Sequence, residues 1–353
     1  MHIPDGYLSP QTDAILGVAS ALTAAGAAYK TAKTVQAKYM PLISIGAAFS
    51  FTIMMFNVPI PDGTTAHAVG GSLLAILLGP WAATIGISIA LAIQAFFFGD
   101  GGILALGANI FNMAVILPFS AYFIYRLIAG HSNINSKRRL LAAALAGYIS
   151  LILAALAAGM EFGIQPLLFH TADGTPLYSP YGLKMAVSAM LFAHVTVAGP
   201  VEGAITALVV AYLQRTNPAL LQLLQSQNNP NSGTETAISK RKLVLGLVIL
   251  ALLSPLGLLA SGTAWGEWSL EEVQAQLGFI PLGMAKFAGF WHHSVFPDYG
   301  LAGFEQTFWH QALFYLLSAF LGLILIGLVA YIFQRTARKG RHEHGATHLA
   351  AKK

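Results

Sequence analysis

The amino-acid sequence predicts an all-α integral membrane protein: a seven-helix bundle with its N-terminus outside, followed by two further transmembrane helices. Among the 353 residues, 56% are hydrophobic and 9% are charged, whereas about 25% of an average soluble domain is charged. So few charged residues cannot cover a soluble protein of this length, and the mean hydropathy of +0.65 agrees. The composition therefore excludes a soluble enzyme and a disordered chain. The lack of cysteine excludes a disulfide scaffold, zinc–thiolate sites and thiol nucleophiles.

Apolar segments recur along the chain at the length of a membrane span, which is about 20 residues. The nine segments expected to be helical are 14–29, 41–57, 64–79, 80–98, 104–125, 140–160, 183–213, 243–262 and 312–333. The third and fourth could form one long helix, but Gly79-Pro80 predicts a break because proline suits the first turn of a new helix. We therefore expect two separate helices, with Thr64 or Thr65 as the N-cap of the first.

The basic residues indicate the topology, because lysine and arginine concentrate in the cytoplasmic loops of membrane proteins. With a break at Pro80 and the N-terminus outside, 17 of the 19 Lys and Arg residues fall in inner segments. These inner segments are 30–40, 126–139, 214–242 and the tail from residue 335. Without the break, the loop that holds Arg138 and Arg139 would lie outside and the pattern would be lost. The net charge of +5 is thus interpreted as topology and not as nucleic-acid binding.

A polar linker divides the chain into two membrane parts. Residues 214–242 are rich in Asn, Gln and Ser and end in a basic cluster, which is typical of a cytoplasmic linker. The linker separates a bundle over residues 1–213 from a two-helix part over 243–334, whose helices flank an external loop at 263–311. We expect the tryptophans of this loop to anchor it at the membrane interface. Residues 335–353 form a basic, histidine-containing cytoplasmic tail, which either buffers metal or is merely solvated.

Met1-His2 and His67 are the strongest candidates for a metal site. The stretch MHIPDGYLSP has no basic region and no convincing cleavage site, so we expect no signal peptide and an N-terminus that stays at Met1. A chain that begins X-His offers its α-amine, the amide nitrogen of residue 2 and the imidazole Nδ1, which close a five-membered and a six-membered chelate ring. The topology places His67 on the same outer side, where its imidazole supplies a fourth nitrogen. Two prolines and a turn at Asp5-Gly6 stiffen the leading segment, as an inserted terminus requires.

The type of ligand narrows the type of ion. Four nitrogens in a plane favour Ni(II) or Cu(II), and low-spin Co(II) also fits, whereas zinc prefers a tetrahedron. Each histidine also has an ordinary interpretation: His2 alone is an accident of an exposed terminus, and His67 alone is a hydrogen-bonded residue at a helix interface. The hypothesis depends on the two histidines lying together.

Other polar residues are candidates for a lid or for the surroundings of the site. They are Gly99, Asp100, Gly101 and Gly102 in an outer loop, and Gln94, Asn109 and Asn112 in apolar helices. Polar groups inside a membrane demand partners and are candidates for function; the alternative for each is a plain interhelical hydrogen bond. Glu202, in the seventh helix, has either a neighbouring side chain or the bundle interior as its partner.

Missing motifs narrow the class further. The chain has no G-x-x-x-x-G-K-[ST], no H-E-x-x-H and no G-x-S-x-G, so we expect no enzyme activity and no ATPase of its own. Two other classes remain open, namely a secondary carrier driven by ions and a structural or assembly protein without a solute.

Three long stretches resemble a known family. MHIPDGYLSP, PDGTTAHAVGG and FFFGDGGILALGANIFNM look like the CbiM/NikM family, the substrate-binding membrane component of energy-coupling-factor transporters for cobalt and nickel. This resemblance covers residues 1–213. The part from 243 onward, with FPDYGLAG in its external loop, resembles the small two-helix partner NikN or the related CbiN. The whole chain is therefore similar to a fused importer component of the NikMN type.

The resemblance implies a transporter subunit without catalysis and without a prosthetic group, multi-pass in the cell membrane. It implies that the ion is held by the amine and backbone nitrogen of the first two residues and by two imidazoles, here Met1, His2 and His67. The glycine-rich loop, Asn109 and Gln94 then correspond to the surroundings of the ligands or to a gate. The implied partners are a transmembrane coupling subunit, cytoplasmic ATPase subunits and the lipid bilayer, with no nucleic acid.

The resemblance also bears on the ion. The start MHIPDG and the NikN-like part favour Ni(II), whereas cobalt members often begin MHIMEG. Co(II) import for cobalamin biosynthesis by the same mechanism is the alternative. Because Ni(II) and Co(II) are neighbours in intrinsic affinity and Cu(II) binds nitrogen more tightly, selectivity must come from cavity geometry and metal supply.

Overall fold

A computed structural model describes residues 1–35, 39–61, 63–222, 240–260, 262–301, 303–304 and 307–350. Side chains are described throughout these ranges except at Gln222, at Lys240 and after Ile332. The central part of the expected linker, 223–239, and the side chains of the histidine-containing tail therefore lie outside the described residues.

The described chain is mostly helical, with one small antiparallel sheet. In chain order the elements are α1 (Pro10–Thr34), α2 (Met40–Met54), β1 (Val58–Ile60), β2 (Thr64–Ala66), α3 (Gly71–Leu78), α4 (Pro80–Ile93), η2 (Gln94–Phe98), α5 (Leu106–Asn109), η3 (Ile110–Ile116), α6 (Leu117–Ala129), α7 (Lys137–Leu168), α8 (Leu183–Ala193), η4 (His194–Ala198), α9 (Gly199–Thr216), η5 (Leu220–Gln222), α11 (Lys240–Leu253), η6 (Ser254–Leu259), α12 (Leu270–Leu277), α13 (Leu282–Phe287), η7 (Pro297–Tyr299) and α14 (Phe308–Ala350). Elements η2, η3 and η4 are π-helical and continue α-helices without a break in the chain direction.

The helical membrane class predicted from composition is confirmed. Within the described ranges, six helical stretches are long and apolar enough to cross a membrane: Pro80–Phe98, Leu106–Ala129, Lys137–Leu168, Leu183–Thr216, Arg241–Leu259 and Phe308–Ile332. Helix α2 is apolar but shorter. The 25-residue helix α1 is long but carries several polar side chains.

The third expected helix, 64–79, is wrong in its first half. Residues Thr64 and Thr65 belong to strand β2, which pairs with β1 in an antiparallel hairpin, so neither is an N-cap. Helix α3 begins only at Gly71, and its eight residues are about 12 Å long, too short to span a bilayer. The physical reason is that β-branched Thr-Thr suits a strand, while Gly70 adopts a left-handed φ of 74° that starts the helix later.

The predicted break between the third and fourth helices is confirmed. Helix α3 ends at Leu78 and α4 begins at Pro80, with Gly79 between them at a φ of 86°. Glycine tolerates this left-handed backbone, and proline removes the N–H that a continuous helix would need. One continuous apolar run therefore becomes two helices that pack against each other.

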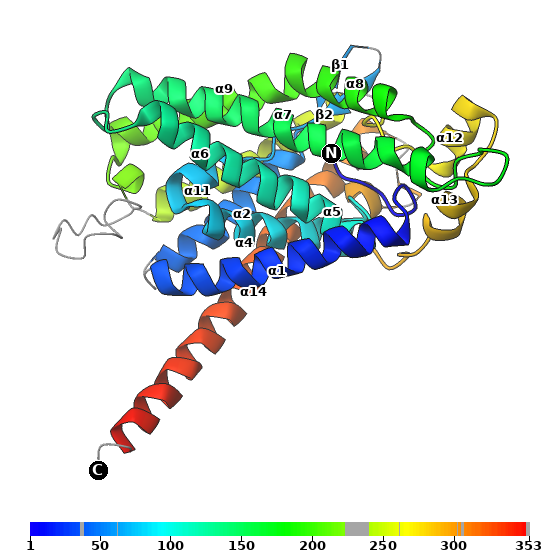
Figure 1. Ribbon diagram of the computed structural model, residues 1–353. Helices are drawn as coiled ribbons and strands as arrows, with labels where there is room; N and C mark the ends of the chain where they lie inside the picture. Colours follow the sequence, from blue (N-terminus) through cyan, green and yellow to red (C-terminus); the bar gives the residue numbers. More distant parts are fainter. Residues whose placement is uncertain are drawn as a thin grey trace.

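The two parts of the chain form one body (Figure 1). Helices α12 and α13 of the expected external loop lie at the same end of the bundle as the start of α1, and α14 leaves the bundle and projects away from it. The second part also contacts the first inside the bundle, because α14 and α11 both pack against α2.

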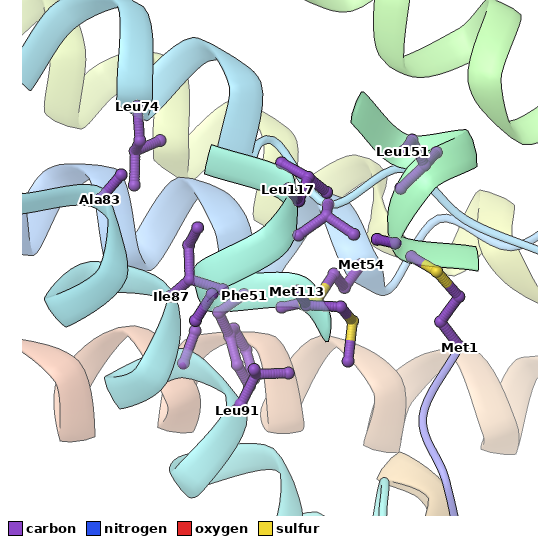
Figure 2. Close-up of a cluster of buried hydrophobic side chains, with 14 of the residues drawn as sticks. Met1, Phe51, Met54, Leu74, Ala83, Ile87, Leu91, Met113, Leu117 and Leu151 are labelled. Carbon is purple, nitrogen blue, oxygen red and sulfur yellow. The ribbon is translucent and has the colours of Figure 1, made fainter. Parts of the chain in front are cut away.

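The first residue of the chain is part of the hydrophobic core. Met1 is 5% exposed as a residue and belongs to the main buried cluster. Figure 2 shows it reaching toward Met54, Leu117 and Leu151 from the leading segment. Burial of a methionine side chain stabilises the folded state by about 1.5–3 kcal/mol, so the N-terminus is fixed by packing and does not fray.

Candidate metal centre

The leading segment is held in the bundle through Ile3. Its backbone N–H donates to Asn109 Oδ1 at 2.7 Å, and Asn109 Nδ2 donates back to the Ile3 carbonyl at 3.1 Å. The N–H of Gly102 donates to the same carbonyl at 2.8 Å. Both backbone groups of a fully buried residue are thus satisfied, which buried peptide groups require. Asn109, which was expected near the site, lies there and holds the first residues by these two hydrogen bonds to Ile3. We call it the clamp of the leading segment.

The glycine-rich loop packs directly on the leading segment, as a lid would. Asp5 Oδ1 accepts hydrogen bonds from the backbone N–H groups of Leu104 at 2.8 Å and Ala105 at 3.3 Å. A Cβ atom on Gly102 would lie 2.1 Å from Asp5 Oδ1, and one on Gly101 would lie 2.9 Å from Asn109 Nδ2. Glycine is required at both positions because the two segments approach this closely.

The two histidines meet inside the bundle. His67 Nδ1 lies 3.0 Å from the carbonyl oxygen of Ala68; a carbonyl only accepts, so Nδ1 carries the proton and Nε2 keeps its lone pair. That Nε2 lies 3.2 Å from His2 Nδ1. His2 and His67 are both buried, at 2% and 6% exposure. The pairing that the metal hypothesis needs is therefore present.

The two backbone donors converge on a carboxylate from the second part of the chain. The α-amine of Met1 donates to Glu267 Oε1 at 2.8 Å, and the backbone N–H of His2 donates to the same oxygen at 3.0 Å. Sequence reasoning missed Glu267 as a site residue. Its signal is weak, because a glutamate in a loop between two tryptophans is ordinary until the fold brings it to the N-terminus.

Tryptophans flank Glu267 and dock its loop on the bundle. Trp265 and Trp268 pack against Tyr181 with ring centroids 5.0 and 5.5 Å away. The hydroxyl of Tyr7, in the leading segment, donates to the Trp268 carbonyl at 2.8 Å. These two tryptophans therefore join the loop to the bundle, and their role as interfacial anchors stays a prediction.

Burial keeps the His2 imidazole neutral. It lowers the pKa of His2 to about 4; the nearby positive amine lowers it too, while Glu267 and Gln94 oppose the shift in part. Neutral imidazole is the form that binds metal. His2 Nδ1 faces the lone pair of His67 Nε2 and the carboxylate of Asp100, so it carries the ring proton, which moves to Nε2 before Nδ1 can bind a metal.

Asp100 and Gln94 lie next to His2, joined by a tyrosine of the second part. Asp100 Oδ1 is 3.2 Å from His2 Nδ1. Its other oxygen accepts from the Tyr299 hydroxyl at 2.5 Å and from Gln94 Nε2 at 3.2 Å. Burial raises the pKa of Asp100. Tyr299 has a φ of 62°, a strained backbone for a bulky residue, and it too was not foreseen as a site residue.

Glu202 has the bundle interior as its partner. Its carboxylate accepts from the backbone N–H groups of Val69 at 2.8 Å and Gly70 at 2.9 Å. Ser72 N–H is the third donor, at 3.3 Å. These bonds satisfy the open end of α3 and fix the chain beside His67.

Asn112 lies apart from this arrangement. Its Nδ2 donates to Glu161 of α7 at 2.7 Å, which is the plain interhelical bond that was its alternative.

A cavity of about 780 Å³ reaches the two histidines and is rich in carboxylates. The acidic residues that line it are Asp5, Asp100, Glu267, Glu271, Glu272 and Asp298. Clefts lined by one sign of charge raise the local concentration of counter-ions, so the cavity favours cations.

The arrangement depends on backbone nitrogens. Over the described ranges, no three His, Cys, Asp or Glu side chains group as a metal-holding cluster. A transition-metal ion beside His2 and His67 would take its remaining nitrogens from the amine and the residue-2 amide.

Family models match two separate ranges of the chain. A family model described as "Cobalt uptake substrate-specific transmembrane region" matches residues 2–220, and one described as "PDGLE domain" matches residues 241–339. The fused nickel transport protein NikMN of Rhodobacter capsulatus is 45% identical over 96% of this chain and 100% of its own length. The probable fused nickel transport protein LarMN of Lactiplantibacillus plantarum is 44% identical over 97% and 100%. A crystal structure of a truncated transition metal transporter is 60% identical, with a TM-score of 0.57 over 60% of this chain and 98% of that one.

Proposed function

This chain belongs to the CbiM family of cobalt-uptake substrate-specific transmembrane proteins, and from that premise we propose that it captures Ni(II) outside the cell membrane for ATP-driven import. The observation that supports the proposal is that the Met1 amine and the His2 N–H point at one carboxylate oxygen, while His2 Nδ1 of the same residue lies 3.2 Å from His67 Nε2. In the proposal these four nitrogens surround one ion. In this proposal the chain is the substrate-specific component of an energy-coupling-factor transporter.

The chemistry of the four nitrogens suits a square-planar ion. At a metal–nitrogen distance of roughly 2 Å, two neighbouring ligands lie about 2.8 Å apart, close to the 3.2 Å between the two imidazole nitrogens. The amine and the amide release their protons as they bind, and the imidazoles, already neutral, release none. Release of these two protons balances the two positive charges that the ion brings into a buried site.

Nine membrane segments with the N-terminus outside complete the proposed topology. Helices α12 and α13 and the carboxylate-lined cavity would then face the outside, where the ion arrives. The basic segments 30–40 and 126–139 would face the cytoplasm, as the positive-inside rule requires. The short helix α3 and the extended residues before it, which include His67, together form one of these membrane segments.

In this proposal the energy comes from partner subunits, since the sequence has no P-loop of its own. A transmembrane coupling subunit and cytoplasmic ATPases would reorient this component after loading, and the ion would leave toward the cytoplasm. The loop of Gly99 to Gly102, which packs on the leading segment, would close the loaded site.

Competitive binding of Ni(II) and Co(II) to the purified chain tests the proposal. We expect one ion per chain with nickel preferred; a cobalt preference would assign the chain to cobalt import. Inserting one alanine between Met1 and His2 breaks the chelate while leaving both side chains in the sequence. Normal nickel affinity in this variant would refute the four-nitrogen site.

Two other functional classes have their own readouts. A purified chain that binds neither ion would point to a structural or assembly protein. Metal uptake that survives deletion of the partner ATPase genes would point to a secondary carrier driven by ions.

A further inference from the structure

A carboxylate oxygen from the second part of the chain lies where the proposed ion would bind. Glu267 Oε1 accepts from the Met1 amine at 2.8 Å and from the His2 N–H at 3.0 Å. Both groups therefore point at one position. In a chelate the same two nitrogens point at one metal ion.

The distances show that the carboxylate and the ion exclude each other. A metal–nitrogen bond is roughly 2 Å long, and an amide nitrogen that loses its proton binds along the direction of the former N–H. An ion bound in this way would lie about 1 Å from the present position of Oε1, about half the length of a metal–oxygen bond. Oε1 must therefore withdraw by about 1 Å or more when the ion arrives.

We propose that the Glu267 carboxylate is a place-holder for the metal ion. It gathers the amine and the residue-2 N–H into chelating geometry in the metal-free protein, and it withdraws as the ion takes both nitrogens. The two hydrogens that it accepts leave to solvent in that step. The inference rests on the proposed four-nitrogen site and makes the second part of the chain a loading device for it.

The loop around Glu267 is built to hold such a place-holder. Trp265 and Trp268 join it to the bundle at Tyr181. The next helix, α12, starts with a complete capping box between Ser269 and Glu272, which fixes the backbone on the other side. The Glu267 side chain itself is 20% exposed and borders the cavity, so it has room to withdraw.

Loss of the Glu267 carboxylate would change the rate at which the ion associates more than the rate at which it dissociates. Without Glu267, the amine and residue 2 lose a shared anchor and must be ordered during binding, which costs conformational entropy at that step. We expect association of nickel to slow about tenfold, since preorganisation lowers the cost of binding. Dissociation should change less than about twofold, because the carboxylate does not touch the bound ion.

Stopped-flow binding of NiCl₂ to the full-length chain in detergent measures both rates. The variants are Glu267→Ala, Glu267→Gln and, as the matched control, Glu271→Gln from the same loop and cavity. The glutamine carbonyl still accepts both hydrogen bonds, so Glu267→Gln should recover part of the association rate. The control removes one charge from the same cavity without touching either hydrogen bond, so it measures the electrostatic share of any slowing, and Glu267→Ala should slow association clearly more. Thermal unfolding of each variant shows whether it is folded. If Glu267→Ala does not fold, the association rate of Glu267→Gln tests the place-holder.

Three outcomes would overturn the place-holder. Faster dissociation with an altered nickel absorption band would make Glu267 a ligand of the bound ion. Unchanged association would make its two hydrogen bonds merely structural, and faster association would make the carboxylate only an obstacle. Failure of the wild-type chain to bind nickel, or normal binding after the alanine insertion, would instead refute the proposed function itself.

Discussion

The two halves of the candidate site are held in different ways. His67 is fixed within the first part of the chain. Its ring is hydrogen-bonded to the Ala68 carbonyl, and the backbone that follows it donates three N–H hydrogen bonds to the Glu202 carboxylate. The Met1-His2 half is fixed partly by Glu267, which comes from the second part. One half is therefore preformed by the bundle, whereas the other depends on a contact between the two parts.

This difference indicates which half of the site can move when the ion binds. A buried carboxylate that satisfies three backbone N–H groups cannot leave without exposing them, so the His67 half is rigid. The Glu267 side chain is partly exposed beside a cavity, and its partners are the first atoms of the chain. Moving it costs less, and the site can be loaded from that side.

The largest expected effect comes from breaking the rigid half. Glu202→Ala leaves three buried backbone donors without an acceptor, and the free energy of unfolding should fall by about 3–5 kcal/mol. Thermal unfolding in detergent measures the loss. Glu202→Gln keeps one acceptor oxygen and should lose less; equal melting of Glu202→Ala and wild type would contradict this account of the His67 segment.

Removing the imidazole of the same half should affect the metal and not the fold. His67→Ala deletes one proposed ligand, and nickel affinity should fall by more than about 100-fold, the upper range for loss of an outer contact to a ligand. Equilibrium competition with a chelator of known affinity gives the value. His170→Ala, which changes an exposed histidine in a loop, is the control and should bind nickel normally.

The pH dependence separates backbone from imidazole ligands. Each proton released on binding makes the affinity fall about tenfold for every unit by which the pH drops. The Met1-His2 half releases protons from the amine and the amide. Burial lowers the pKa of His2 to about 4, so its ring is neutral between pH 6 and 8 and releases none. Titrations in buffers of different ionisation enthalpy count the protons; a count of zero would exclude the amide as a ligand.

The smallest effect is expected at the clamp of the leading segment. Asn109→Ala removes the acceptor of the Ile3 N–H at 2.7 Å, and loss of one such bond costs about 1 kcal/mol. Nickel affinity should fall about fivefold to tenfold because residues 1–3 are held less firmly. Asn112→Ala, three residues on, breaks a bond to Glu161 instead. It should lower stability while leaving the affinity of the folded protein unchanged, and similar affinities for both variants would refute the clamp.

The sequence predicted the local features of this molecule well. Composition and the length of the apolar runs predicted a helical membrane protein, and Gly79-Pro80 predicted the break between α3 and α4. Both depend on neighbours along the chain, which the sequence displays directly. The same reasoning failed at Thr64 and Thr65, because a hairpin with residues 58–60 competes with the helix and its pairing partner is not in the local window.

What remained out of reach were contacts between distant residues. Glu267 and Met1 are 266 positions apart, and Tyr299 reaches Asp100 across 199 positions. Glu202 was noticed as a buried charge, but its three backbone donors could not be named. A carboxylate has many acceptable partners, and only packing selects among them.

The sequence by itself determined that this chain is a helical membrane protein, and its first residues with His67 indicated nitrogen ligands for a metal. The tertiary structure alone decided that His2 and His67 lie together, that Glu202 holds one half and that Glu267 holds the other. The physical reason is that hydropathy and local backbone preference act over a few residues, whereas ligand geometry is set to within an ångström by long-range packing.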